Sequence, residues 1–71
     1  MGLLVKNITV VNLQGTARYA IGDKIEGVEI VKIKDESLEY ETQYVSLYFI
    51  YGENDKLLKG LENCPVDVTY L

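Results

Sequence analysis

The sequence has no histidine and no tryptophan, and it contains only one cysteine and one proline. Without histidine the commonest general base is missing, and Ser-His or Cys-His catalytic pairs cannot form within one chain. The lone Cys64 excludes an intrachain disulfide and, without histidine, leaves no ligand set for zinc. We therefore expect no enzyme, no metal site and no bound cofactor. We interpret Cys64 as a small, partly buried apolar side chain.

Long apolar runs and an excess of basic residues are also missing. Leu3-Leu4-Val5 is too short for a signal segment or a membrane span, and no basic region precedes it. Eleven acidic residues against seven basic ones give a net charge of −4. Nonspecific binding to nucleic acid depends on neutralised phosphates, so this charge disfavours duplex binding. We expect a cytoplasmic protein that does not bind membranes.

The chain is short enough to need a stabilising device beyond its own core. Its 71 residues predict a single domain over 1–71, and the hydrophobic fraction of 48% is typical of a folded domain. A core of this size supplies roughly 3–5 kcal/mol. Disulfides and metals are excluded, so association with further copies of the chain is the remaining device. The sequence therefore predicts a homo-oligomer.

The stretch from Tyr44 to Tyr51 is the most strand-like part of the sequence, and we predict that it is one central strand. One face would carry Val45, Leu47, Phe49 and Tyr51, and the other Tyr44, Ser46, Tyr48 and Ile50. Both faces are largely apolar, which is typical of a strand covered on two sides. A small barrel has no second layer, so we expect the face with Tyr44, Tyr48 and Ile50 to need cover from another molecule.

Alternating and β-branched patterns predict five more strands, over Leu3–Asn12, Thr16–Ile21, Val28–Lys34, Leu38–Thr42 and Val66–Leu71. Turn residues separate them at 12–15, 22–24 and 52–55. The apolar phase slips at Ile30-Val31, where a β-bulge would bring both flanking pairs to one core, and Gln43 is a candidate second bulge. Residues 56–63 fit a strand or a short helix. We favour the strand because the preceding strand needs a partner.

Short strands separated by turn signals predict a small all-β domain, a five- to six-stranded antiparallel barrel or sandwich. Ile21-Gly22-Asp23-Lys24-Ile25, just before the predicted bulge, is similar to the entries into SH3-type barrels. Many unrelated small folds share this feature. The expected class is therefore SH3-like in type and carries no family assignment.

The candidate binding residues are the only arginine, Arg18, and several of the six tyrosines. Arginine makes bidentate contacts with phosphate or carboxylate, and tyrosine stacks on bases or anchors interfaces. The predicted ligand- or partner-binding site comprises Arg18, Tyr19, Tyr44, Tyr48 and Tyr51. The alternative is that Arg18 pairs with a surface acid and the tyrosines fill the barrel. Glu39 and Glu41 could act as a pair of carboxylates, but acids on a solvated strand face explain them better.

The expected function is binding. In size, acidity and lack of catalytic residues the chain is similar to small proteins of phages and mobile elements, which often block a host component. We predict an inhibitor or adaptor of this anti-defence type that binds a partner protein. One alternative is a sequestering protein that holds a nucleotide-like anion at Arg18 between subunits. Another is a structural subunit of a larger assembly, in which free edge strands pair across copies.

Overall fold

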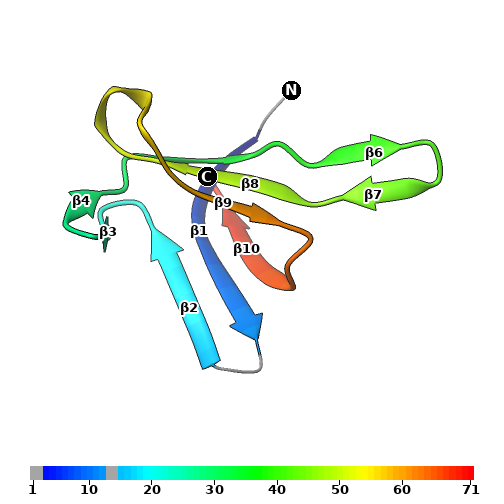
Figure 1. Cartoon of the computed structure of the whole chain (residues 1–71), viewed down its shortest axis with the longest axis horizontal. Helices are drawn as coiled ribbons and strands as arrows, with labels where there is room; N and C mark the ends of the chain where they lie inside the picture. The colour runs from blue at the N-terminus through cyan, green and yellow to red at the C-terminus, as the bar shows by residue number, and fades with distance from the viewer. Residues whose placement is uncertain (1–2, 13–14) are drawn as a thin grey trace.

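The computed structural model describes residues 3–12 and 15–71, and its regular structure is almost entirely β (Figure 1). The strands are β1 (Leu3–Asn12), β2 (Gly15–Ala20), β3 (Lys24–Ile25), β4 (Val28–Glu29), β5 (Lys32–Asp35), β6 (Leu38–Tyr40), β7 (Gln43–Val45), β8 (Leu47–Tyr51), β9 (Leu57–Glu62) and β10 (Val66–Tyr70). Among the described residues, one 3-10 turn, η1 (Glu53–Asp55), lies between β8 and β9. The prediction of a small all-β domain is confirmed. The predicted turn at 12–15 includes residues 13–14, which lie outside the described residues.

The main sheet is antiparallel and curls into a half-barrel. Its strand order is β10-β1-β5-β8-β9, and β2 joins as an additional partner of β1. Two short hairpins, β3–β4 and β6–β7, form separate two-stranded sheets. No ladder joins β9 to β10 in the described part of the chain, so the sheet stays open on that side (Figure 1).

The long strand β1 contacts three other strands. Its first residues, Leu3 and Leu4, pair with β5, and its later residues, Asn7 to Asn12, pair with β2. β10 pairs along the opposite edge, from Val5 to Val10. The register shifts between Val5 and Asn7, as expected for a bulge where a strand changes direction. β5 and β2 therefore lie along the same edge of β1 and diverge from each other.

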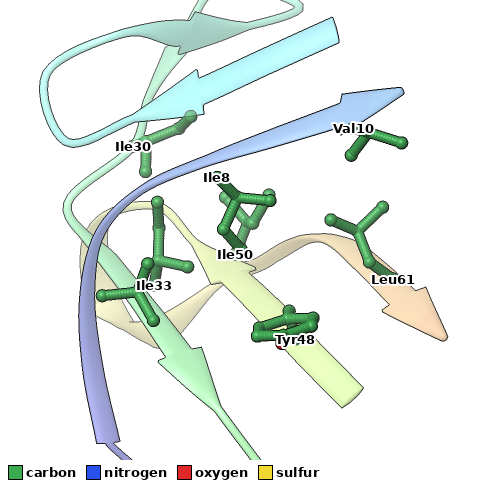
Figure 2. Packing of buried hydrophobic residues seen from close by; sticks show 8 residues of the cluster. Ile8, Val10, Ile30, Ile33, Tyr48, Ile50 and Leu61 are labelled. Carbon is green, nitrogen blue, oxygen red and sulfur yellow. The ribbon is translucent and has the colours of Figure 1, made fainter. Parts of the chain in front are cut away.

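The core lies on the concave side of the sheet, where β-branched and aliphatic side chains of several strands meet (Figure 2). The five largest fully buried side chains are Ile8, Ile30, Ile33, Ile50 and Val5. Val10, Tyr48 and Leu61 complete the buried cluster. Buried side chains alternate with half-buried ones along β5 and β8, which is the period expected for strands with one face in the core. In β1 the spacing from Val5 to Ile8 is three residues, because the bulge between Val5 and Asn7 interrupts the alternation. We call the opposite side of the sheet its outer face.

The predicted single strand over residues 44–51 is two strands. Ser46 separates β7 from β8, and β7 pairs with β6 in a hairpin that projects from the half-barrel (Figure 1). We call this hairpin, residues 38–45, the arm. The prediction of one strand over 38–42 with a bulge at Gln43 is also wrong, because the chain turns back at Glu41, whose φ is +51°. A sharp turn at a non-glycine residue leaves little signal in the apolar pattern.

The prediction that one face of the central strand needs cover from another molecule is wrong for Tyr48 and Ile50. Tyr48 and Ile50 of β8 are 6% and 0% exposed, and both belong to the chain's own core. The outer face of β8 is half-buried by side chains of this same chain. The rings of Phe49 and Tyr51 lie 6.5 Å apart there, and Nζ of Lys32 is 4.8 Å from the centre of the Tyr51 ring. Of the three residues expected to need cover, Tyr44 on the arm is the one that is exposed to solvent.

The strand is irregular at Ile30-Val31, as predicted from the phase slip, but Val31 does not enter the core as expected. β4 ends at Glu29 and β5 begins at Lys32, so the pairing is interrupted where the phase slips. Ile30 and Ile33 both enter the core, at 0% and 1% exposure, whereas Val31 is 43% exposed. The interruption brings one flanking residue from each side to the core and turns Val31 outward.

Residues 56–63 form a strand, as favoured from the sequence. β9 pairs antiparallel with β8 from Leu47↔Glu62 to Tyr51↔Leu57. The 3-10 turn η1 makes the tight connection between them, with Asn54 and Asp55 at positive φ. In residues 3–12 and 15–71, no helix is long and apolar enough to cross a membrane.

Candidate functional site

The structure spreads the five predicted binding residues over different parts of the fold. Tyr48 is in the core, and Tyr19 is half-buried and packs against that core. Tyr51 is half-buried on the outer face of β8. Tyr44 is 62% exposed on the arm, and Arg18 is exposed on β2. The structure does not bring these five side chains together at one surface.

Arg18 and Tyr19 point to opposite faces of the sheet, as consecutive strand residues must. Tyr19 is paired with the fully buried Ile8, which places its ring on the core side. Arg18 is paired with Thr9 on the outer face. The predicted pocket in which the guanidinium and this ring act together is therefore not formed within one chain.

A groove that the sequence did not reveal lies between β2 and β5. Because both strands leave the same edge of β1 in different directions, they open a concavity whose floor is the β1 segment from Leu4 to Asn7. Its volume is about 650 Å³. Of the five predicted binding residues, Arg18 lines this groove, and Tyr51 lies next to it, because Nζ of the lining residue Lys32 is 4.8 Å from the centre of the Tyr51 ring.

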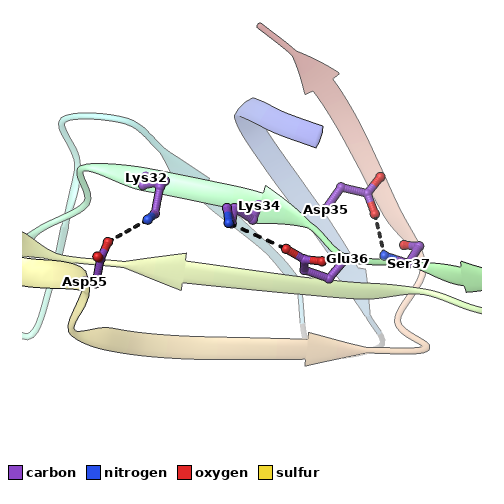
Figure 3. A network of polar contacts seen from close by, with 6 residues as sticks. All are labelled: Lys32, Lys34, Asp35, Glu36, Ser37 and Asp55. Atoms are coloured by element: carbon purple, nitrogen blue, oxygen red, sulfur yellow. Dashed lines mark hydrogen bonds and ion pairs between the residues drawn. The ribbon is translucent and has the colours of Figure 1, made fainter. Parts of the chain in front are cut away.

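Cationic side chains line this groove. Lys6 lies in its floor and Arg18 and Lys32 in its walls, and no acidic residue among the described ones belongs to the lining. Lys32 is already occupied, because its Nζ lies 2.6 Å from Asp55 Oδ1 (Figure 3). Lys6 and Arg18 form no ion pair within residues 3–12 and 15–71. A protein with a net charge of −4 thus gathers three cationic side chains around one concavity, and two of them have no ion pair among the described residues.

The rest of the groove lining is aliphatic. Leu4, Ile21 and Val31 are 49%, 42% and 43% exposed, and all three lie in it. Aliphatic side chains exposed to this extent usually occur singly on a monomer surface, so their grouping around one concavity points to binding. None of the described lining residues is aromatic. The groove therefore matches an occupant with negative charge and aliphatic or mixed apolar surface.

A second polar feature surrounds Asp35, which is the one buried charged residue in the described part of the chain, at 8% exposure. Oδ1 of Asp35 accepts a hydrogen bond of 2.9 Å from the Ser37 backbone N–H (Figure 3). Oδ2 accepts one of 2.6 Å from the Tyr70 hydroxyl. Asp35 points toward β10, whereas Lys32 and Lys34 lie on the other side of β5 (Figure 3).

These contacts move pKa values in opposite directions. Burial alone raises the pKa of the Asp35 carboxyl, but the hydrogen bonds from Ser37 and Tyr70 outweigh it and hold that pKa below its ordinary value. The hydrogen bond to Asp35, together with burial, strongly raises the pKa of the Tyr70 hydroxyl. Burial and the nearby Asp35 charge also raise the pKa of Tyr48. At neutral pH the carboxylate is charged and both phenols are neutral, so the cluster is electrostatically satisfied.

The Asp35 cluster fixes the root of the arm. Ser37 Oγ accepts a 3.1 Å hydrogen bond from the Leu47 backbone N–H, and the Glu36 N–H donates one of 2.8 Å to the Leu47 carbonyl. On the other side of the root, the Asn63 N–H donates one of 2.9 Å to the Ser46 carbonyl. Hydrogen bonds therefore close the arm at the point where it leaves the half-barrel.

Two further observations concern side chains that could bind a metal or react. Among the described residues no three His, Cys, Asp or Glu side chains gather as metal ligands would. Cys64 is half-buried against the core, and its thiol donates a 3.4 Å hydrogen bond to the Glu62 carbonyl. The Asp35 carboxylate is held by hydrogen bonds from Ser37 and Tyr70.

No protein family, curated protein or solved structure matches this chain. The groove and the arm are therefore interpreted from their own chemistry.

Sequence reasoning selected Arg18 and missed the residues that surround it. Arg18 attracted attention as the only arginine, and it does line the groove. The missing signal was three-dimensional, because Lys6 and Val31 meet Arg18 only where two strands leave one edge of β1. The phase slip at Val31 could have indicated this surface, because it places an aliphatic side chain on the outside of the sheet.

Proposed function

We propose that this chain is a non-enzymatic binding protein, an inhibitor or adaptor that takes an acidic, apolar segment of a partner protein into the groove between β2 and β5. The observation that carries the proposal is the pairing of two uncompensated cations, Lys6 and Arg18, with exposed aliphatic side chains in one concavity. Complementary charge guides a partner and sets its register, and desolvated aliphatic contacts supply affinity.

The test uses peptides displayed on phage and selected on the immobilised protein. We expect the selected sequences to combine Asp or Glu with Leu, Ile or Tyr. Synthetic peptides of the consensus should bind the Lys6→Glu/Arg18→Glu double variant at least about tenfold more weakly, because charge attraction becomes repulsion. The matched control is Lys56→Glu, an exposed lysine that does not line the groove, which should leave affinity unchanged. If the selected peptides bound the Lys6→Glu/Arg18→Glu variant as tightly as the wild type, the proposal would be wrong.

A second candidate is sequestration of a small anion at Arg18. It is favoured by the groove volume of about 650 Å³, which falls in the range of small-molecule sites, roughly 300–1,000 Å³. It is disfavoured for nucleotides because the described lining offers no aromatic ring on which a base could stack. Titration with AMP and with inorganic phosphate, followed by calorimetry, separates the cases. Binding of AMP that is lost in Arg18→Ala would establish this candidate over the first.

A further inference from the structure

The arm has too little structure of its own to be stable without cover. β6 and β7 each have three residues, pair only with each other among the described strands, and project away from the half-barrel (Figure 1). An isolated two-stranded hairpin is at best marginally stable in water. Its root, however, is fixed by the Asp35 and Ser37 hydrogen bonds. A firmly anchored, otherwise unsupported hairpin is the form expected of an element that packs on another molecule.

The exposed surface of the arm combines acidic and apolar side chains. Leu38 and Tyr44 are 56% and 62% exposed, which makes Tyr44 the most exposed tyrosine of those described. Glu39 is directly opposite Tyr44 in the hairpin register, so the carboxylate and the phenol ring lie on one face. Glu41 follows at the turn, and residues 38–45 contain no lysine or arginine. This is the composition that the groove would attract.

We propose that the arm of one copy docks in the groove of a second copy, with Glu39 and Glu41 facing Lys6 and Arg18 and with Tyr44, on the same face as Glu39, against the aliphatic wall. The inference rests on the proposed function, because it names the segment that fills the same groove. The occupant is argued from charge complementarity within one sequence, since an acidic arm and a basic groove occur on a chain that is acidic overall.

The arm belongs to a second copy because its own groove is out of reach. The root hydrogen bonds direct the arm along the longest axis of the molecule, which measures 39 Å, and away from β2 (Figure 1). Folding the arm back onto its own groove would break those bonds. Docking between copies keeps them and gives each chain the cover that a short single-domain chain without a disulfide lacks.

The experiment exchanges charge between the two surfaces. In the groove variant, Lys6→Glu/Arg18→Glu, both arm and groove are acidic. In the arm variant, Glu39→Lys/Glu41→Lys, both are basic. We expect the wild type to associate at micromolar concentration in analytical ultracentrifugation. Each variant alone should associate at least about tenfold more weakly, because like charges meet.

An equimolar mixture of the two variants should associate again. The basic arm of one variant fits the acidic groove of the other, and the acidic arm fits the basic groove, so both contacts are restored. Lys56→Glu and Glu53→Lys, exposed residues outside both surfaces, are the matched single-charge controls and should associate as the wild type does. Tyr44→Ser tests the apolar part of the contact and should also weaken association. Circular dichroism checks that every variant keeps the β-fold.

A wild type that remains monomeric at high concentration, or a mixture that fails to associate, would overturn the inference. The arm variant also separates this inference from the proposed function, because its groove is intact. If it binds the selected acidic peptides but the wild type does not self-associate, the proposed function stands and arm docking is wrong. If it binds no such peptide, the proposed function fails whatever the oligomeric state.

Discussion

The hydroxyl of Tyr70 lies 2.6 Å from Oδ2 of Asp35 and joins β10 to the end of β5, directly beside the root of the arm. Asp35 is buried and charged, so this hydrogen bond replaces part of the hydration that the carboxylate loses on folding. A hydrogen bond to a charged group stabilises more than one between neutral groups. The contact between Tyr70 and Asp35 therefore stabilises both the sheet and the base of the arm.

Replacing Tyr70 by phenylalanine should destabilise the protein. The ring remains and the hydrogen bond to Asp35 is lost, so we expect the free energy of unfolding to fall by about 1–2 kcal/mol. Urea denaturation measures this change in unfolding free energy. The protein concentration is kept low and constant, because self-association would otherwise add to the apparent stability. The control is Tyr44→Phe, in which an exposed hydroxyl is removed and little change is expected. Equal losses in the two variants would refute the role of the Asp35 contact.

Stability should fall at acid pH in a way that depends on Asp35. The pKa of its carboxyl is lower in the folded protein than in the unfolded chain, so the unfolded chain binds the proton first as pH decreases. The stabilisation from Asp35 is therefore complete above about pH 4 and is lost as the pH falls through the folded pKa.

The variant Asp35→Asn isolates this contribution. It should be less stable than the wild type at pH 7, and the difference in unfolding free energy should shrink below about pH 4. Urea denaturation across a pH series provides the measurement. A difference that stays constant from neutral to strongly acidic pH would show that the carboxylate charge is not what stabilises the cluster.

Gly52 should not tolerate a side chain. A methyl group at this position would lie 2.9 Å from Val28 Cγ1 and 3.4 Å from the Glu29 carbonyl oxygen, where the turn after β8 passes close to β4. We expect Gly52→Ala to reduce the unfolding free energy by about 1–3 kcal/mol, because backbone and side chain must both shift. In Gly60→Ala the added methyl would meet only the Phe49 ring, at 3.6 Å from Cδ1 and 3.7 Å from Cε1, which are ordinary van der Waals contacts, so no loss is expected. A loss of equal size at Gly60 would contradict this difference.

The outward orientation of Val31 can be tested by comparing alanine substitutions at Val31 and at the buried Ile33. Ile33 is 1% exposed in the core, and truncation to alanine should lower the unfolding free energy by about 2–4 kcal/mol. Val31 is 43% exposed, so Val31→Ala should have an effect below about 0.5 kcal/mol. Thermal or urea unfolding of both variants is sufficient. If Val31→Ala proved the more damaging of the two, the outward orientation of Val31 just before β5 would be wrong.

Most of the fold follows from the sequence, since strand periodicity and turn residues are local properties. The first strand, the break near Ile30 and the hairpin across Gly52 were predictable for that reason. The split at Ser46 was not, because Tyr44 and Val45 have the same strand propensity whether they continue β8 or return along β6. The turn at Glu41 decides between these two pairings. Glutamate is not a typical turn residue, so the sequence contains no clear signal for this turn.

The candidate site was harder to predict than the fold. The abundance of tyrosine suggested an aromatic surface, yet Tyr48 is in the core and Tyr19 packs against it. Tyrosine in a small barrel fills space as readily as it binds a partner, so its number carries little information about function. Arg18 was identifiable because it is the only arginine, but its neighbours in the groove come from β1 and β5. Their proximity depends on the strand order, which pattern analysis cannot supply.

The branching of β1 bears on how the chain acquires its shape during synthesis. The hairpin of β1 with β2 can close as soon as both have left the ribosome. The other edge of β1 pairs with β10, through pairs such as Val5↔Tyr70, so it stays open until residues 66–70 have been synthesised. Until then a long unsatisfied strand edge is exposed to other nascent chains, and the slow, nonlocal closure makes this interval the period of greatest aggregation risk.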